Sequence, residues 1–69
     1  MTNKEKYLEQ VREIARFIQY EGHDILEQIE MIDNVEDAMF VERKFGEVWD
    51  KAGNAVLILQ KLNDELEED

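Results

Sequence analysis

Apolar residues recur every three or four positions along almost the whole chain, a spacing typical of amphipathic helices rather than strands. In the first half this repeat comprises Leu8, Val11, Ile14, Ala15, Ile18, Gly22, Ile25, Ile29 and Ile32. At about 100° per residue, these positions fall within one arc of roughly 120°. Thr2 and Glu5 have the spacing of a capping box, in which the Thr hydroxyl accepts a bond from a free helical N–H. The pattern predicts a helix over about residues 3–32.

A second helical repeat follows a polar break. Its apolar members are Ala38, Val41, Phe45, Val48, Trp49, Ala52, Ala55, Val56, Leu59, Leu62 and Leu66. Asp33 or Asn34 is expected to cap this helix, with Glu36 or Asp37 beside the positive end of its dipole. The repeat predicts a helix over about 35–66. Residues 67–69 are acidic and oppose the dipole there, so we expect them to fray.

The second helix contains a candidate break at Gly53-Asn54, which would produce three helices in all. Gly in a helix interior costs about 1 kcal/mol relative to Ala. The apolar repeat nevertheless passes through Gly53 without a shift, which favours one continuous helix. Two helices of about 30 residues joined by a short connection lie antiparallel. We therefore predict an all-α fold, a long antiparallel helical hairpin that forms a single domain over 1–69.

A chain of 69 residues buries only about 60% of its unfolded surface, so further stabilisation is expected. The sequence has no Cys and a single His, His23, which excludes disulfides and disfavours a metal site. Self-association remains, and we expect a homodimer in the form of a four-helix bundle. The residues expected to hold the core are Ile18, Ile25, Phe45, Trp49, Ala52, Val56 and Leu59.

The second helix has more apolar residues than a hairpin needs. Met39, Gly46, Gly53 and Leu57 share one side of it, with Trp49 between them and the main apolar stripe. Small residues at heptad spacing let another backbone approach, while Trp and Met supply contact area. We interpret these five residues as a dimer or helix-docking face. The alternatives are scattered surface apolar residues and a groove for a helix of another protein.

The net charge of −10 argues against direct binding to nucleic acid or to an anionic membrane, because both are negative. It favours a partner protein with a basic surface. No apolar run reaches the roughly 20 residues that a membrane span needs. The polar start Met-Thr-Asn-Lys-Glu-Lys is unlike a signal peptide. We therefore expect a cytoplasmic protein.

Acidic residues are concentrated around the predicted connection. From Phe17 to Glu42 the chain has no Lys or Arg, although like charges three or four apart on a helix repel by roughly 0.2–0.5 kcal/mol per pair. We name the eight acidic residues of this stretch the acidic band: Glu21, Asp24, Glu27, Glu30, Asp33, Glu36, Asp37 and Glu42. The simplest interpretation is that these residues form a solvated helix face with no binding role.

The functional interpretation of the acidic band is that it docks on a basic site of a partner protein. Basic sites that bind nucleic acid are one class of such sites. Such a surface imitates the phosphates of a nucleic acid and steers association electrostatically. Phe17, Tyr20 and Phe40 lie near the band and are expected to anchor the contact. In size and charge the chain resembles the small acidic inhibitors of nucleic-acid enzymes that phages and mobile elements encode.

A second resemblance concerns metal-binding carboxylates. Glu27-x-x-Glu30 followed by Glu47-x-x-Asp50 resembles the metal-binding pattern of the all-α nucleoside triphosphate pyrophosphatases, the MazG-like family. The resemblance covers about 25 residues and implies Mg²⁺-dependent release of pyrophosphate from a nucleotide. The chain departs from the family in three ways: the doubled Glu of the first motif is absent, Glu27 points away from the apolar side, and the chain is short for the family's substrate-binding helices.

Nucleophilic catalysis has no support, because there is no Cys or Ser and Thr2, the only Thr, has a capping role. His23 is expected to be an exposed surface residue. We therefore expect no catalytic residues, no metal and no cofactor, and predict a non-catalytic interaction protein that acts as an inhibitor or regulator. The alternatives are an assembly module acting through its second apolar face and a MazG-like pyrophosphatase.

Overall fold

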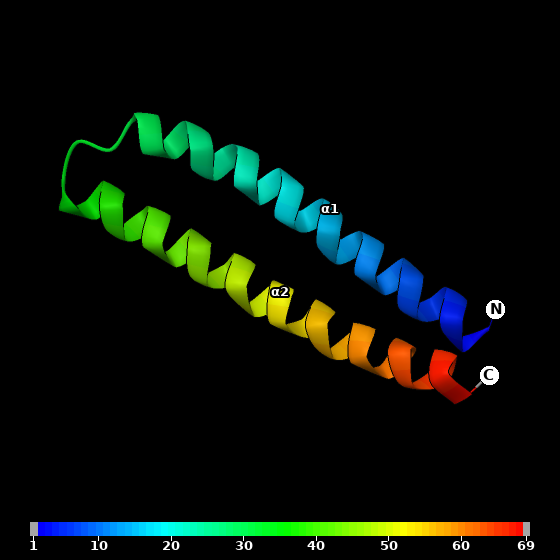
Figure 1. Ribbon diagram of the computed structural model, residues 1–69. Coiled ribbons are helices and arrows are strands. Elements are labelled where there is room, and N and C mark those ends of the chain that lie inside the picture. Colours follow the sequence, from blue (N-terminus) through cyan, green and yellow to red (C-terminus); the bar gives the residue numbers. More distant parts are fainter. Residues whose placement is uncertain (1, 69) are drawn as a thin grey trace.

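The computed structural model describes residues 2–68 and shows two long antiparallel helices (Figure 1). Helix α1 spans Asn3–Glu30 and helix α2 spans Val35–Glu68. The hairpin measures 53 × 16 × 13 Å, so it is a rod with the connection at one end and both chain ends at the other. Near the chain ends, Asn3 Nδ2 donates a hydrogen bond of 3.3 Å to Glu65 Oε1. The prediction of an all-α helical hairpin is confirmed.

Helix α1 begins where the capping pattern predicts. The backbone N–H of Glu5 donates to Thr2 Oγ1 over 3.2 Å, which satisfies one of the free donors of the first turn. The helix ends at Glu30, two residues before the predicted end. There the N–H of Met31 bonds the carbonyl of Gln28 at 3.0 Å, and that of Ile32 bonds the carbonyl of Ile29 at 3.3 Å. Such bonds tighten and close the last turn.

The connection carries its own capping arrangement. Asn34 Oδ1 accepts the N–H of Asp37 at 2.9 Å, so Asn34 is the N-cap of α2. In return, Asp37 Oδ2 accepts the N–H of Asp33 at 3.2 Å. The backbone N–H groups of Asp33 and Asp37 thus both have side-chain acceptors from within the same five residues. This local bonding explains how four residues, 31–34, turn the chain.

Helix α2 is continuous through Gly53, as predicted. It also continues to Glu68, two residues past the predicted end, so residues 67 and 68 are helical in this structure. An unfavourable dipole contact costs only about 0.3–1 kcal/mol at an exposed site, which is compatible with a helix that includes these two residues. Asp69, the third residue of the expected frayed end, lies outside the described residues.

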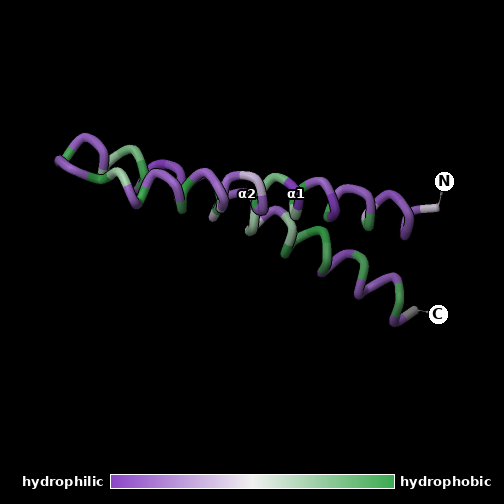
Figure 2. Tube along the Cα trace, turned by 90° about the horizontal axis from the view of Figure 1, so that it is seen from above, coloured by the Kyte–Doolittle hydropathy of each residue, from purple (hydrophilic) through white to green (hydrophobic). Residues whose placement is uncertain are grey.

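The interface between the helices consists of side chains at heptad spacing. Ile25 of α1 and Val41 and Leu62 of α2 are buried, and no side chain among residues 2–68 is fully buried. The surrounding residues Ile14, Ile18, Val48, Ala55 and Ile58 are half-buried. Seen from above, the helices cross at an angle (Figure 2), as expected for packing with a seven-residue apolar repeat. The hairpin core is therefore thin.

The expected core is correct for α1 and mostly wrong for α2 within the hairpin. Ile18 and Ile25 lie in the interface, and Ala52 is half-buried. The other four expected core residues are exposed: Phe45, Trp49, Val56 and Leu59. The physical reason is that α2 has two adjacent apolar stripes of the same period, and the stripe containing Val41, Val48, Ala55 and Leu62 faces α1 instead.

The cap at Asn34 provides a test of the reversal. We expect Asn34→Ala to lower the free energy of unfolding by about 1 kcal/mol, because the Asp37 N–H loses its acceptor. A loss of that size lowers Tm by about 4–8 °C in a domain this small. The matched control is Asn54→Ala at an exposed position in the middle of α2, which should be neutral or slightly stabilising. Equal effects of the two substitutions in thermal unfolding followed by circular dichroism would contradict the capping role.

Candidate protein-interaction surfaces

The fold buries one carboxylate of the acidic band, that of Glu21, and partly covers a second, that of Asp24. Glu21 is only 9% exposed, and its Oε2 lies 3.0 Å from Lys44 Nζ of α2. The same ammonium group lies 3.6 Å from Asp24 Oδ2, and Asp24 is half-buried. Lys44 lies outside the acidic stretch in sequence, but the antiparallel packing returns it to the same level of the rod. The structure therefore relieves part of the predicted repulsion through a cross-helix cation.

The charge of Lys44 is favoured by this environment. The hydrogen bond to Glu21 raises the pKa of Lys44 above its usual range, and the negative charges of Glu21, Asp24 and Glu47 act in the same direction. Burial opposes the shift but does not reverse it. The ammonium also lies 5.5 Å from the centre of the Phe40 ring, at cation–π distance. Lys44 is thus held by groups from both helices.

The remaining members of the acidic band are near the connection. Glu27, Glu30, Asp33, Glu36 and Glu42 are exposed, and Asp37 is half-buried in the cap of α2. Glu27 Oε1 lies 3.6 Å from Nε2 of His23, one helical turn away, and both side chains are exposed. His23 therefore lies on the surface, as expected. Five carboxylates of the band remain available to a partner.

Apolar side chains lie exposed among these acids, and the apolar repeat did not predict them. Val35 is 73% exposed and Met31 is 60% exposed, and both flank the reversal. We name this end of the rod the acidic tip: Glu27, Glu30, Met31, Asp33, Val35 and Glu36. The signal that could have found it is the position of Met31 and Val35, which are apolar yet belong to neither helical stripe. An exposed apolar centre with a charged rim is the composition of a protein-interaction surface.

The three expected aromatic anchors have different environments. Tyr20 is the most exposed of them, and Phe40 is exposed but shares its ring face with the Lys44 ammonium. Phe17 is half-buried, and Lys51 Nζ lies 5.6 Å from the centre of its ring. Tyr20 is therefore the one with the largest free surface.

The expected docking face lies on α2 outside its contact with α1. Met39, Trp49 and Leu57 are exposed. A Cβ placed on Gly46 or Gly53 would meet nothing within 4 Å, so neither glycine is needed for the approach of α1. Within the single chain, the three large side chains of this expected face are therefore exposed and neither glycine has a close neighbour on α1.

A second apolar surface combines both helices. A shallow groove of about 240 Å³ runs between them, and every residue that lines it is apolar: Ile18, Gly22, Ile25, Leu26, Ile29, Phe45 and Val48. Trp49, Ala52, Val56 and Leu59 continue the α2 wall of the groove at spacings of three and four residues. We name the exposed part of this surface the open face: Leu26, Ile29, Phe45, Trp49, Val56 and Leu59.

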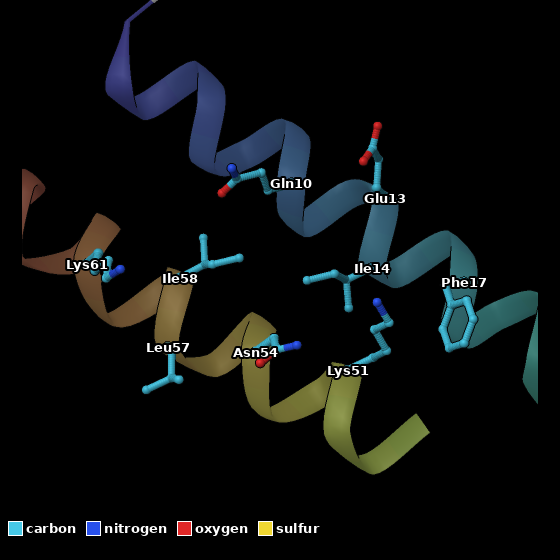
Figure 3. Close-up of a pocket in the computed structure, with 9 residues that line it drawn as sticks. All are labelled: Gln10, Glu13, Ile14, Phe17, Lys51, Asn54, Leu57, Ile58 and Lys61. Atoms are coloured by element: carbon cyan, nitrogen blue, oxygen red, sulfur yellow. The ribbon is translucent and has the colours of Figure 1, made fainter. Parts of the chain in front are cut away.

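The groove on another side of the hairpin is chemically different (Figure 3). It measures about 520 Å³ and is lined by Gln10, Glu13, Ile14, Phe17, Lys51, Asn54, Leu57, Ile58 and Lys61. Figure 3 shows Ile14 and Ile58 pointing toward one another between the helices, whereas Leu57 points away from α1. Polar and charged side chains surround this contact and cover part of it with their stems. The two sides of the rod therefore differ, one mixed and one apolar.

The carboxylates of the MazG-like resemblance are all exposed: Glu27, Glu30, Glu47 and Asp50. Across residues 2–68, no three or more His, Asp or Glu side chains come together in a way that could hold a metal ion. Over the same residues, neither helix is apolar over a stretch long enough to cross a membrane. No protein-family model matches the chain, and comparisons with curated proteins and with solved structures find no match.

The Glu21–Lys44 pair provides a test of the interface. We expect Lys44→Met to destabilise the hairpin, because it leaves the nearly buried Glu21 carboxylate without its partner. The double variant Glu21→Leu/Lys44→Met should recover stability, since two apolar side chains then fill the same space. Urea unfolding followed by circular dichroism measures the stability of the wild type, the single variant and the double variant. A double variant that is less stable than the single one would contradict the partnership.

The same pair predicts a dependence on alkaline pH. A raised folded-state pKa means that the contribution of Lys44 is fully present below the ordinary lysine value of 10.5 and is lost as pH rises through the folded value. The stability difference between the wild type and Lys44→Met should therefore be constant around neutrality and narrow above that value. Urea midpoints of both proteins over an alkaline pH series measure it. A stability difference between the two proteins that widens at high pH would contradict a raised pKa of Lys44 in the folded state.

Proposed function

We propose that this chain is a small non-catalytic interaction protein, an inhibitor or regulator, whose acidic tip docks on a basic surface of a partner protein. The observation that carries the proposal is that exposed apolar side chains lie at the same end of the rod as a stretch of acidic residues that contains no Lys or Arg. Met31 and Val35 stand exposed between Glu27, Glu30, Asp33 and Glu36. Met31 and Val35 do not pack in the hairpin core, and the side chains of the capping bonds at the reversal are those of Asn34 and Asp37.

The electrostatic part of the argument concerns the distribution of charge. Residues 27–42 carry six acidic side chains and no Lys or Arg. Lys44 compensates Glu21 and Asp24, which lie further along the rod, so the field of the tip is left uncompensated. A field of one sign steers a basic partner and raises its association rate. Basic sites that bind nucleic acid are the class of partner with the matching chemistry.

The apolar part of the argument concerns affinity. Charged rims contribute mainly to association rate and specificity, whereas most binding energy comes from a few buried apolar or aromatic anchors. Met31 is unbranched and fits irregular pockets, and Val35 is the most exposed aliphatic residue of the tip. Burial of these two side chains on a partner would release the ordered water around them. The tip thus combines both contributions within one small surface.

An assembly module is the second candidate, and the open face favours it. Its apolar residues are exposed along much of α2 and part of α1, beyond what the hairpin itself can bury. On this candidate, two hairpins pair into a four-helix bundle through apolar contact. Both candidates are compatible in one molecule because the tip and the open face are different surfaces.

The tip is tested by a charge reversal with a matched control. Glu27→Lys/Glu30→Lys/Glu36→Lys changes the net charge by six units, from −10 to −4. The control Glu9→Lys/Glu13→Lys/Asp64→Lys makes the same change with exposed residues of the other half of the rod. We expect the tip variant to bind a basic partner protein about a hundredfold more weakly, because attraction becomes repulsion. The control should bind within a few-fold of the wild type.

The partner is obtained by affinity capture from the cells that make the protein, and its purified complex is measured at low and high salt. Binding by the wild type should weaken steeply with salt. Equal losses in the tip variant and the control would show that net charge, not the tip, determines binding. Circular dichroism provides the folding control. The tip variant should be about as stable as the wild type, because reduced like-charge repulsion and a Lys at the end of α1 offset the loss of Glu36 from the first turn of α2.

A further inference from the structure

We propose that the open face is covered by a second copy of this chain, and that the two hairpins pair antiparallel, with the acidic tip of each beside the chain ends of the other. The inference rests on the self-association of the second candidate and adds the surface and the orientation. It is independent of whether the acidic tip binds a partner. Four observations carry it: exposed area, a thin core, the composition of the face and the distribution of charge.

The exposed area is larger than a compact chain of this mass allows. A folded monomer of 8.2 kDa is expected to expose about 4,500 Å². This hairpin exposes 5722 Å², an excess of about 1,200 Å² over that expectation. Burying the excess on two copies would remove about 2,400 Å² in total, within the range of about 2,000–5,000 Å² for obligate homodimers.

The core of the single hairpin is thin. Only Ile25, Val41 and Leu62 are buried apolar residues among the described part of the chain. Trp49, by contrast, is 79% exposed and Phe45 is 52% exposed. Large aromatic side chains each bury about 150–250 Å² when covered, so covering the exposed parts of these two residues would enlarge the apolar core substantially. The sequence has no Cys for disulfides, and residues 2–68 hold no cluster of side chains that could bind a metal as a substitute.

The composition of the face identifies the kind of partner. The groove beside Phe45 is lined entirely by apolar residues, so its occupant must also be apolar along its length. The open face itself fits that requirement, because Trp49, Val56 and Leu59 extend its apolar surface along α2. Two copies related by a two-fold axis contact each other through the same surface, as in most homodimers. The result is a four-helix bundle in which this face becomes the centre.

The charge distribution selects the orientation. Residues 17–50, the half of the rod nearest the connection, carry ten acidic and two basic residues, a net charge of −8. The other half, residues 1–16 and 51–69, carries eight acidic and six basic residues, a net charge of −2. A parallel pair would place −8 beside −8, whereas an antiparallel pair places −8 beside −2. At ordinary salt, charges repel appreciably within about 10 Å. Neighbouring helices of a bundle lie at about that distance, so the difference affects the pairing.

The first experiment separates the open face from other apolar surfaces. Light scattering on a sizing column should give about twice 8.2 kDa for the wild type and 8.2 kDa for Phe45→Glu/Trp49→Glu. The matched control is Met39→Glu/Leu57→Glu, which introduces the same charges at exposed apolar residues outside the open face. The control should remain dimeric. A monomeric wild type, or a dimer lost only in the control, would overturn the proposal.

A second measurement keeps the proposal testable if the open-face variant unfolds. The Tm of a wild-type dimer rises with protein concentration, because association stabilises only the folded state. We expect a Tm that rises over a hundredfold range of concentration for the wild type and for the control. A Tm independent of concentration would contradict self-association, whatever the variants do.

The orientation is tested by distances between spin labels on single cysteines, since the native chain has none. Labels at Asp33→Cys on both copies should be separated by nearly the length of the rod, which is 53 Å. Labels at Asp33→Cys on one copy and Lys4→Cys on the other should be close. A short Asp33–Asp33 separation in a confirmed dimer would overturn the antiparallel arrangement alone. The charge-reversal variant at Glu27, Glu30 and Glu36 should keep the molar mass of the dimer. A failure of the acidic-tip proposal can therefore be told apart from a failure of the dimer proposal.

Discussion

Two packed helices share a single interface, so each can bury only one stripe of its side chains against the other. In this protein the shared interface takes Ile18 and Ile25 from α1 and the stripe of Val41 and Val48 from α2. Helix α2 carries a second apolar stripe beside the first, and the geometry of a hairpin leaves it exposed. The thin core, the open face and the proposed pairing all follow from this limit. An apolar surplus in a two-helix protein is therefore informative about association.

The interface also determines which charges remain on the surface. Lys44 reaches Glu21 across the interface and lies near Asp24, so a cation from α2 compensates the inner end of the acidic band. A nearly buried carboxylate needs such a partner, because an unpaired charge in that position is costly. No equivalent cation occurs in the sequence between Glu27 and Glu42. The uncompensated charge is thereby confined to the end of the rod, where Met31 and Val35 are exposed.

Local features of the structure were predictable because they depend on neighbours in sequence. Thr2 caps α1 through Glu5, Asn34 caps α2, and Gly53 does not interrupt the helix. Each of these outcomes is decided within one or two turns of backbone. The candidate site was less predictable. The acidic band was visible as a run of residues, but the removal of Glu21 from its exposed surface depends on a residue 23 positions away.

The sequence by itself determined the two helices, their boundaries to within two residues, the antiparallel hairpin and the acidic end, since periodicity and local capping specify all of these. Only the tertiary structure decided which stripe of α2 faces α1. Both stripes have the same helical period, and the choice depends on how side chains from the two helices fit together. That choice placed Val41 inside and Trp49 outside. It also brought Lys44 to Glu21, because pairing across the rod depends on register and not on sequence distance.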